Sequence, residues 1–81
     1  MLFSDIADLL RKRGYTDYET KDHYRVFYEF DNMDFLYNDC VKKFEMDYHD
    51  GQVEKVVMVQ YFFGSTTFKD ITTLEELKES I

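Results

Sequence analysis

The sequence lacks the residues from which many small proteins build staples, linkers and membrane anchors. Its 81 residues include no proline, three glycines and one cysteine, Cys40. A single cysteine excludes an internal disulfide and an all-cysteine zinc site, and a lone thiol fits a reducing compartment. No apolar run approaches the ~20 residues that cross a membrane, and none follows a basic start as in a signal peptide. We therefore expect a cytoplasmic protein with no membrane partner, and one domain over residues 1–81 because nothing marks a linker or repeat.

Positive charge is also scarce. Ten Lys and Arg residues stand against seventeen Asp and Glu, which gives a net charge of −7. Sequence-independent binding to nucleic acid needs a cationic surface that displaces counterions, and docking on anionic lipid needs one too. The acidity argues against both. Apolar residues nevertheless make up 44% of the chain and aromatic residues 19%, which is too hydrophobic for a disordered acidic tail.

The first half of the chain predicts a helix, a polar segment and a strand. Residues 3–13 carry apolar side chains at helical spacing, with Ser4 as the expected N-cap and Gly14 as the left-handed residue after the helix. Residues 15–22 are polar, and we expect them to be irregular. Residues 24–30 alternate and are rich in β-forming types, so they predict a strand, and residues 31–34 predict a turn.

The middle of the chain predicts a hairpin. We favour a strand over residues 41–48, extended back towards residue 35, although a helix over residues 35–42 is the alternative. Asp50-Gly51 is a strong signal for a two-residue turn. A regular register around it pairs Met46 with Lys55. That register places eight side chains on the core face: Phe44, Met46, Tyr48, Val53, Val57, Val59, Tyr61 and Phe63.

The last part of the chain predicts an edge strand over residues 66–71 and a closing helix. Thr73 is followed three residues later by Glu76, which matches the capping box at the start of a helix. The predicted fold class is therefore α+β. We expect a small three- to four-stranded antiparallel sheet with an N-terminal and a short C-terminal helix packed on one face.

Residues that could carry chemistry are few and scattered. His49 lies near Asp47 and Asp50, which suits a metal ion or a general base, but polar residues beside a hairpin turn are ordinary. No signature of a cysteine enzyme surrounds Cys40. The three glycines are too far apart to cradle a phosphate. We therefore predict that the protein is not an enzyme and holds neither cofactor nor metal.

The acidic excess is concentrated in one segment. Residues 15–40 hold five of the seven excess negative charges and five of the seven tyrosines. Carboxylates steer a basic partner and tyrosines act as rigid anchors. The alternative is a solvated acidic surface that only keeps the protein soluble. The predicted partner-binding residues are Asp17, Tyr18, Glu19, Asp22, Asp31, Asp34, Tyr37 and Asp39.

These features favour a small protein-binding inhibitor. Its acidic surface would occupy a basic nucleic-acid-binding surface of a larger protein, with carboxylates standing in for phosphates. Anti-restriction, anti-CRISPR, glycosylase-inhibitor and nuclease-immunity proteins use this logic, and the parallel is one of size and charge.

The alternative hypothesis is a non-catalytic structural or adaptor module that self-associates through the sheet face opposite the core, giving a homodimer. The regular hairpin register places three apolar residues there, and the strand over residues 24–30 adds a fourth; contiguous apolar patches mark interfaces. These residues are Phe27, Val56, Met58 and Phe62.

Overall fold

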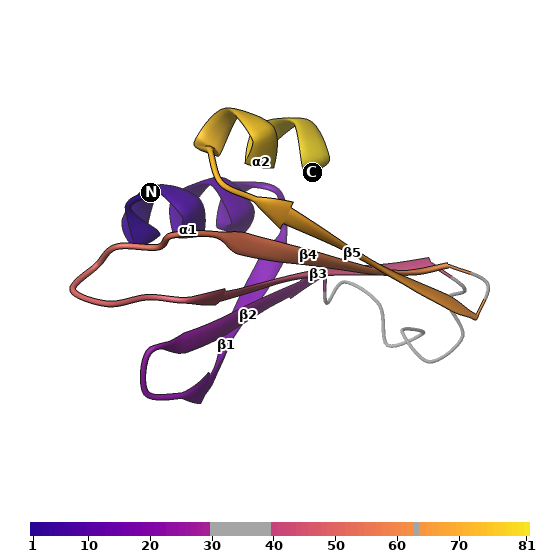
Figure 1. Cartoon of the computed structure of the whole chain (residues 1–81), viewed down its shortest axis with the longest axis horizontal. Coiled ribbons are helices and arrows are strands. Elements are labelled where there is room, and N and C mark those ends of the chain that lie inside the picture. Colours follow the sequence, from indigo (N-terminus) through magenta and orange to yellow (C-terminus); the bar gives the residue numbers. More distant parts are fainter. Residues whose placement is uncertain (30–39, 63) are drawn as a thin grey trace.

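The computed structural model describes residues 1–29, 40–62 and 64–81. Two helices and five strands follow one another along the chain, and the strands form one antiparallel sheet in the order β1-β2-β3-β4-β5 (Figure 1). Each strand therefore pairs with its neighbours in sequence. The elements are α1 (Phe3–Lys12), β1 (Tyr15–Lys21), β2 (Tyr24–Glu29), β3 (Cys40–Asp47), β4 (Val56–Phe62), β5 (Ser65–Ile71) and α2 (Leu74–Ser80).

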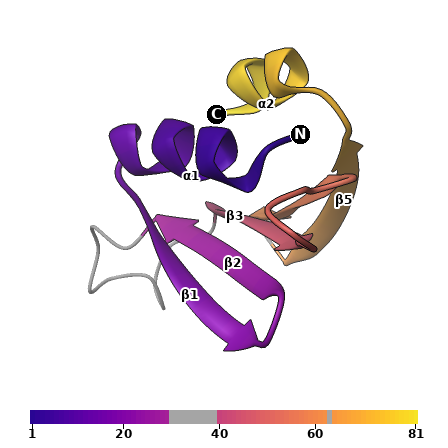
Figure 2. The same cartoon turned by 90° about the vertical axis from the view of Figure 1, so that its left-hand side faces the viewer.

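Both helices lie on the same side of the sheet, so the molecule has two layers (Figure 2). This confirms the α+β class and the position of the helices. The sheet has five strands rather than three or four, because the polar segment expected to be irregular forms β1. Its backbone pairs with β2 from Tyr15↔Glu29 to Lys21↔Tyr24. Tyr15 is the buried residue of this polar edge strand and anchors it in the core.

Helix α1 begins at Phe3, with Leu2 in the N-cap position and no side-chain cap. The predicted cap at Ser4 is wrong, because backbone contacts with the β3–β4 hairpin fix the start of the helix. The Phe3 amide donates to the Gly51 carbonyl at 2.8 Å, and Leu2 forms an isolated bridge with Gln52. Gly14 follows the helix with φ 90°, as its predicted C-terminal role requires.

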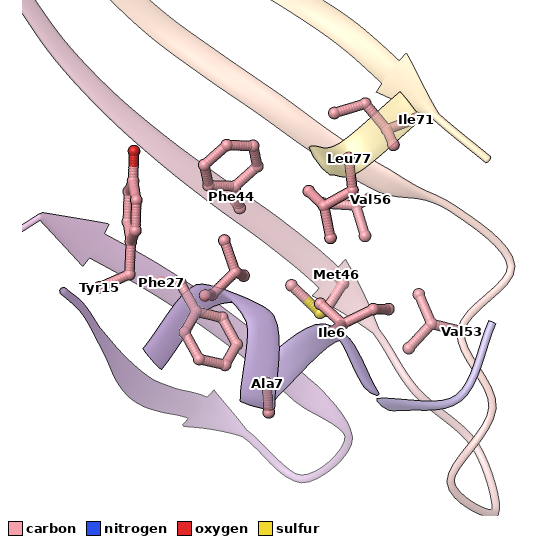
Figure 3. Close-up of a cluster of buried hydrophobic side chains, with 11 residues drawn as sticks. Ile6, Ala7, Tyr15, Phe27, Phe44, Met46, Val53, Val56, Ile71 and Leu77 are labelled. Carbon is pink, nitrogen blue, oxygen red and sulfur yellow. The ribbon is translucent and has the colours of Figure 1, made fainter. Parts of the chain in front are cut away.

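The core fills the space between the helices and the sheet (Figure 3). Phe27 and Phe44 are its largest fully buried side chains, and the Tyr15 ring meets Phe44 edge-on at 5.3 Å. The cluster joins both helices to β1, β2, β3, β4 and β5. Its members are Ile6, Ala7, Leu10, Tyr15, Phe27, Phe44, Met46, Val53, Val56, Ile71 and Leu77.

The β3–β4 hairpin has the predicted turn but a different register. Asp50 and Gly51 have φ values of 52° and 76°, as a two-residue primed turn requires. The regular ladder, however, resumes at Met46↔Val56 rather than Met46↔Lys55. The arm over residues 53–55 therefore holds one residue more than the facing arm. An excess residue of this kind sends every following side chain to the opposite face.

This shift overturns the predicted self-association surface. Val56 is fully buried and Met58 packs against the core on the helix side. Phe27 is fully buried there as well, because it lies opposite Phe44 in the sheet. Phe62 pairs with Cys40, and its side chain lies outside the described residues. Val56, Met58 and Phe27 therefore lie on the core side and cannot form the predicted interface on the opposite face.

The remaining elements follow the sequence pattern. β5 is the edge strand expected over residues 66–71, and the Thr73 side chain accepts a hydrogen bond from the Glu76 amide at 3.1 Å. Residues 40–42 belong to β3 rather than to a helix. The predicted turn over residues 31–34 and the structure of residues 35–39 lie outside the described residues. Among the described helices, none has the length and apolar character to span a membrane.

Candidate protein-binding surface

The structure separates the predicted partner-binding residues instead of gathering them. Asp17 and Glu19 lie opposite Phe27 and Arg25 of β2, so they share the helix side of the sheet. Tyr18 alternates to the other side, and Asp22 lies in the β1–β2 turn. The other four predicted residues lie outside the described part of the chain: Asp31, Asp34, Tyr37 and Asp39.

Arg25 neutralises the two carboxylates on the helix side. Its guanidinium lies 2.8 Å from the Asp17 carboxylate and 3.6 Å from that of Glu19. Arg11 of α1 reaches Asp17 at 3.0 Å. Arg25 also donates a hydrogen bond to the Tyr48 hydroxyl at 3.4 Å, and this bond is the main cause that raises the pKa of Arg25. Asp17 therefore ties α1 to the sheet, and because both carboxylates are paired, they have less free charge for a partner than two isolated carboxylates would have.

The sheet side opposite the helices, which we call the outer face, presents exposed aromatic rings. Large hydrophobic side chains that stay exposed include Tyr18 (59%), Tyr61 (40%) and Phe68 (69%), and all three alternate to this face. Beneath them, Val26 and Val59 are each only 2% exposed, although the helices cover the other side. The outer face therefore combines two buried valines with exposed aromatic rings. Sequence reasoning missed Tyr61 and Phe68 as site residues, because Tyr61 was assigned to the core by the regular register.

Lys43 lies on the central strand of the outer face, between two tyrosine rings and a carboxylate. The Lys43 ammonium lies 5.7 Å from the Tyr28 ring centre and 5.8 Å from that of Tyr61. It also pairs with Glu45 at 3.0 Å. Burial alone lowers the pKa of Lys43, but the hydrogen bond to Glu45 and the neighbouring charges outweigh it and raise that pKa. Lys43 therefore remains charged and fixes the two tyrosine rings beside it.

Tyr24 forms a second polar contact on this face. Burial, together with a hydrogen bond and repulsion from Glu45, raises the pKa of Tyr24 to about 12. The phenol stays protonated at neutral pH and can donate to the Glu45 carboxylate. The Lys21 ammonium lies 5.9 Å from the centre of the Tyr24 ring. A cation is therefore already held beside this ring.

A cavity of about 430 Å³ opens beside Tyr24, where the hairpin carries its excess residue. Asp47 and Glu54 make no ion pair with any other described residue, whereas Lys55 is held by Asp70 at 3.5 Å. The cavity wall is therefore acidic with an aromatic component. Its lining residues are Tyr24, Glu45, Met46, Asp47, His49, Gln52, Glu54, Lys55 and Val57.

The residues considered for catalysis form no metal centre in the described part of the chain. The His23 and His49 rings lie 5.4 Å apart, and both side chains are exposed. No three His, Cys, Asp or Glu side chains among the described residues are arranged to hold a metal ion. The side chain of Cys40 lies outside the described residues.

Comparisons of the chain with protein-family models, with curated proteins and with solved structures found no match. Functional inference therefore depends on the surface itself.

Proposed function

We propose that the protein binds a basic surface of a larger protein through its outer face and thereby excludes nucleic acid from that surface. The observation that carries the proposal is that this face exposes aromatic rings across its width, Tyr18 on β1 and the neighbouring Tyr61 and Phe68 on β4 and β5. The proposal keeps the inhibitor hypothesis, but it moves the binding residues away from Asp17 and Glu19.

The rings are suited to anchor a partner because their backbone is held in the sheet. Tyr61 lies in β4, which pairs on both sides, and Phe68 is its diagonal neighbour on β5. Tyrosine and phenylalanine bury a large area with few rotatable bonds, so ordering them at an interface costs little entropy. An anchor residue of this kind contributes on the order of 2 kcal/mol when it is buried by a partner.

The charge of the chain specifies which partner suits this face. A net charge of −7 favours approach to a cationic surface and disfavours a second copy of the same chain. Asp47 and Glu54 are free of ion pairs with described residues, so their oxygens can accept hydrogen bonds from Arg and Lys side chains. Such side chains otherwise bind phosphate oxygens, so occupation by carboxylates would exclude nucleic acid.

The experiment compares the wild-type protein with a Tyr61→Ser/Phe68→Ser variant as baits in cell lysate at low salt. A Leu2→Ser variant is the matched control, because Leu2 is also an exposed hydrophobic residue (47%) but lies at the start of α1. Each retained protein is then purified, and its direct binding and its displacement from labelled nucleic acid are measured.

We expect a basic nucleic-acid-binding protein that is released by salt, is displaced from its nucleic acid, and binds the double variant at least about tenfold more weakly. Equal binding by wild type and double variant would contradict the proposal. So would a wild-type protein that sediments as a dimer while the double variant is monomeric, because that result assigns the outer face to self-association.

A further inference from the structure

The cavity beside Tyr24 is a consequence of the hairpin's excess residue. Between the bridge His49↔Gln52 and the pair Met46↔Val56, the two arms have unequal lengths. The shorter arm turns towards β2, where the Tyr48 amide donates to the His23 carbonyl at 2.8 Å. The longer arm is drawn the other way, because Val53 exchanges backbone hydrogen bonds with Met1 at 2.7 and 2.8 Å. The arms therefore separate.

The two arms supply different chemistry to the cavity. Tyr24 and Val57 offer a ring and an aliphatic surface, while Asp47 and Glu54 offer carboxylates. The nearby cations of the described residues each contact another group: Lys43 pairs with Glu45, the cavity-lining Lys55 pairs with Asp70, and Lys21 lies over the Tyr24 ring. The cavity is thus an apolar and aromatic hollow with unneutralised carboxylates.

We propose that this cavity receives an arginine side chain. Its source is the basic partner, and this part of the inference rests on the proposed function. The methylene stem packs on Val57, the planar guanidinium stacks against the Tyr24 ring, and its N–H groups donate to Asp47 and Glu54. The Lys21 ammonium beside the same ring shows that the ring already attracts a cation.

The geometry favours arginine over lysine for two reasons. A guanidinium has five donors in one plane, so it can serve two carboxylates from the two arms of the hairpin at once, whereas an ammonium acts as a compact point charge. It is also more weakly hydrated, which lowers the cost of entering a hollow with an aromatic wall.

The probe is N-acetyl-arginine amide, titrated into the isotope-labelled protein and followed by amide chemical shifts; N-acetyl-lysine amide is the comparison. We expect saturable shifts at Tyr24, Asp47 and Val57, with roughly tenfold weaker binding of the lysine probe. An Asp47→Asn/Glu54→Gln variant should lose the saturable shifts.

The matched control is Glu75→Gln/Glu79→Gln, which removes the same charge from exposed positions on α2 and should bind the arginine probe as wild type does. Shifts spread evenly over α2 and the hairpin, equal binding of the lysine probe, or full binding by the Asp47→Asn/Glu54→Gln variant would each overturn the inference.

The same titration distinguishes the two proposals. If the cavity binds arginine saturably but no salt-sensitive basic partner is found, the proposed function is refuted, and the cavity remains assigned as an arginine-binding site. A basic partner bound equally well by the Asp47→Asn/Glu54→Gln variant refutes the role of the cavity and of these two carboxylates, and leaves the exposed rings of the outer face as the binding groups.

Discussion

Threonine substitutions at the adjacent residues Val56 and Val57 test the hairpin register, on which the outer face depends. Threonine matches valine in β-propensity, so the same change at neighbouring positions of β4 leaves the strand preference nearly constant. The difference between the two variants then reports which side chain faces the core.

The structure gives the expected magnitude. Val56 is fully buried within the core cluster, among apolar neighbours that offer a hydroxyl no side-chain partner. An unpaired buried hydroxyl costs about 1–3 kcal/mol. Val57 is half-buried on the outer face beside the open cavity, where water can reach the hydroxyl, so the cost there is about 0.5 kcal/mol or less. Val56→Thr should therefore destabilise the protein more than Val57→Thr by about 1–2 kcal/mol.

The assay is urea unfolding at equilibrium, with the free energy of unfolding compared at constant m-value. Each kcal/mol also lowers Tm by about 4–8 °C in a domain of this size, so thermal melting provides a second readout. A larger loss in Val57→Thr than in Val56→Thr would refute the reasoning, because it would place Val57 in the core and restore the regular register.

Substitutions at three further positions test local interactions. Thr73→Ala removes the cap on the Glu76 amide and should lower the free energy of unfolding by about 1 kcal/mol in thermal melts, whereas Thr73→Ser should not. Arg25→Met removes the ion pair with Asp17 and should cost about 1 kcal/mol at low salt and less at high salt; a salt-independent loss would assign the role of Arg25 to packing. Tyr24→Phe should remove one phenol that titrates near 12, seen as the difference in tyrosinate absorption. Because folding raises this pKa from 10.0, the stability linked to it is complete below pH 10 and is lost as pH rises towards 12. If the titration that Tyr24→Phe removes lay near pH 10 instead, the result would contradict the buried, hydrogen-bonded environment of Tyr24.

The elements that sequence reasoning predicted correctly carry their information locally. The capping pair Thr73 and Glu76 marks the start of α2, and Asp50-Gly51 adopts the positive φ angles that its turn requires. The alternation of residues 24–30 likewise gives β2. In each case, the residues that determine the conformation are separated by only a few positions in the chain.

The elements that were missed depend on contacts between distant residues. β1 is polar, and it becomes a strand because β2 pairs with it and Arg25 neutralises its carboxylates. The hairpin's excess residue depends on Val53, whose backbone bonds to Met1 from 52 positions away. Since neither contact leaves a periodic pattern in the sequence, the register was wrong by one residue. That error exchanged Val56 for Val57 and concealed the outer face.

The two faces of the sheet use the acidic character of the chain differently. On the helix side, Asp17 is paired with Arg25 and Arg11, so its charge contributes to holding α1 against the sheet. Beside the cavity, Asp47 and Glu54 stay unpaired with described residues, and on the outer face Phe68 stays exposed. Unpaired charges and an exposed ring add little to folding, so their replacement should cost little stability. If the outer face is a binding surface, stability and binding are therefore separable: changes at Asp47, Glu54 and Phe68 should weaken binding without lowering Tm, whereas Arg25→Met should lower Tm and leave any binding by the folded protein intact.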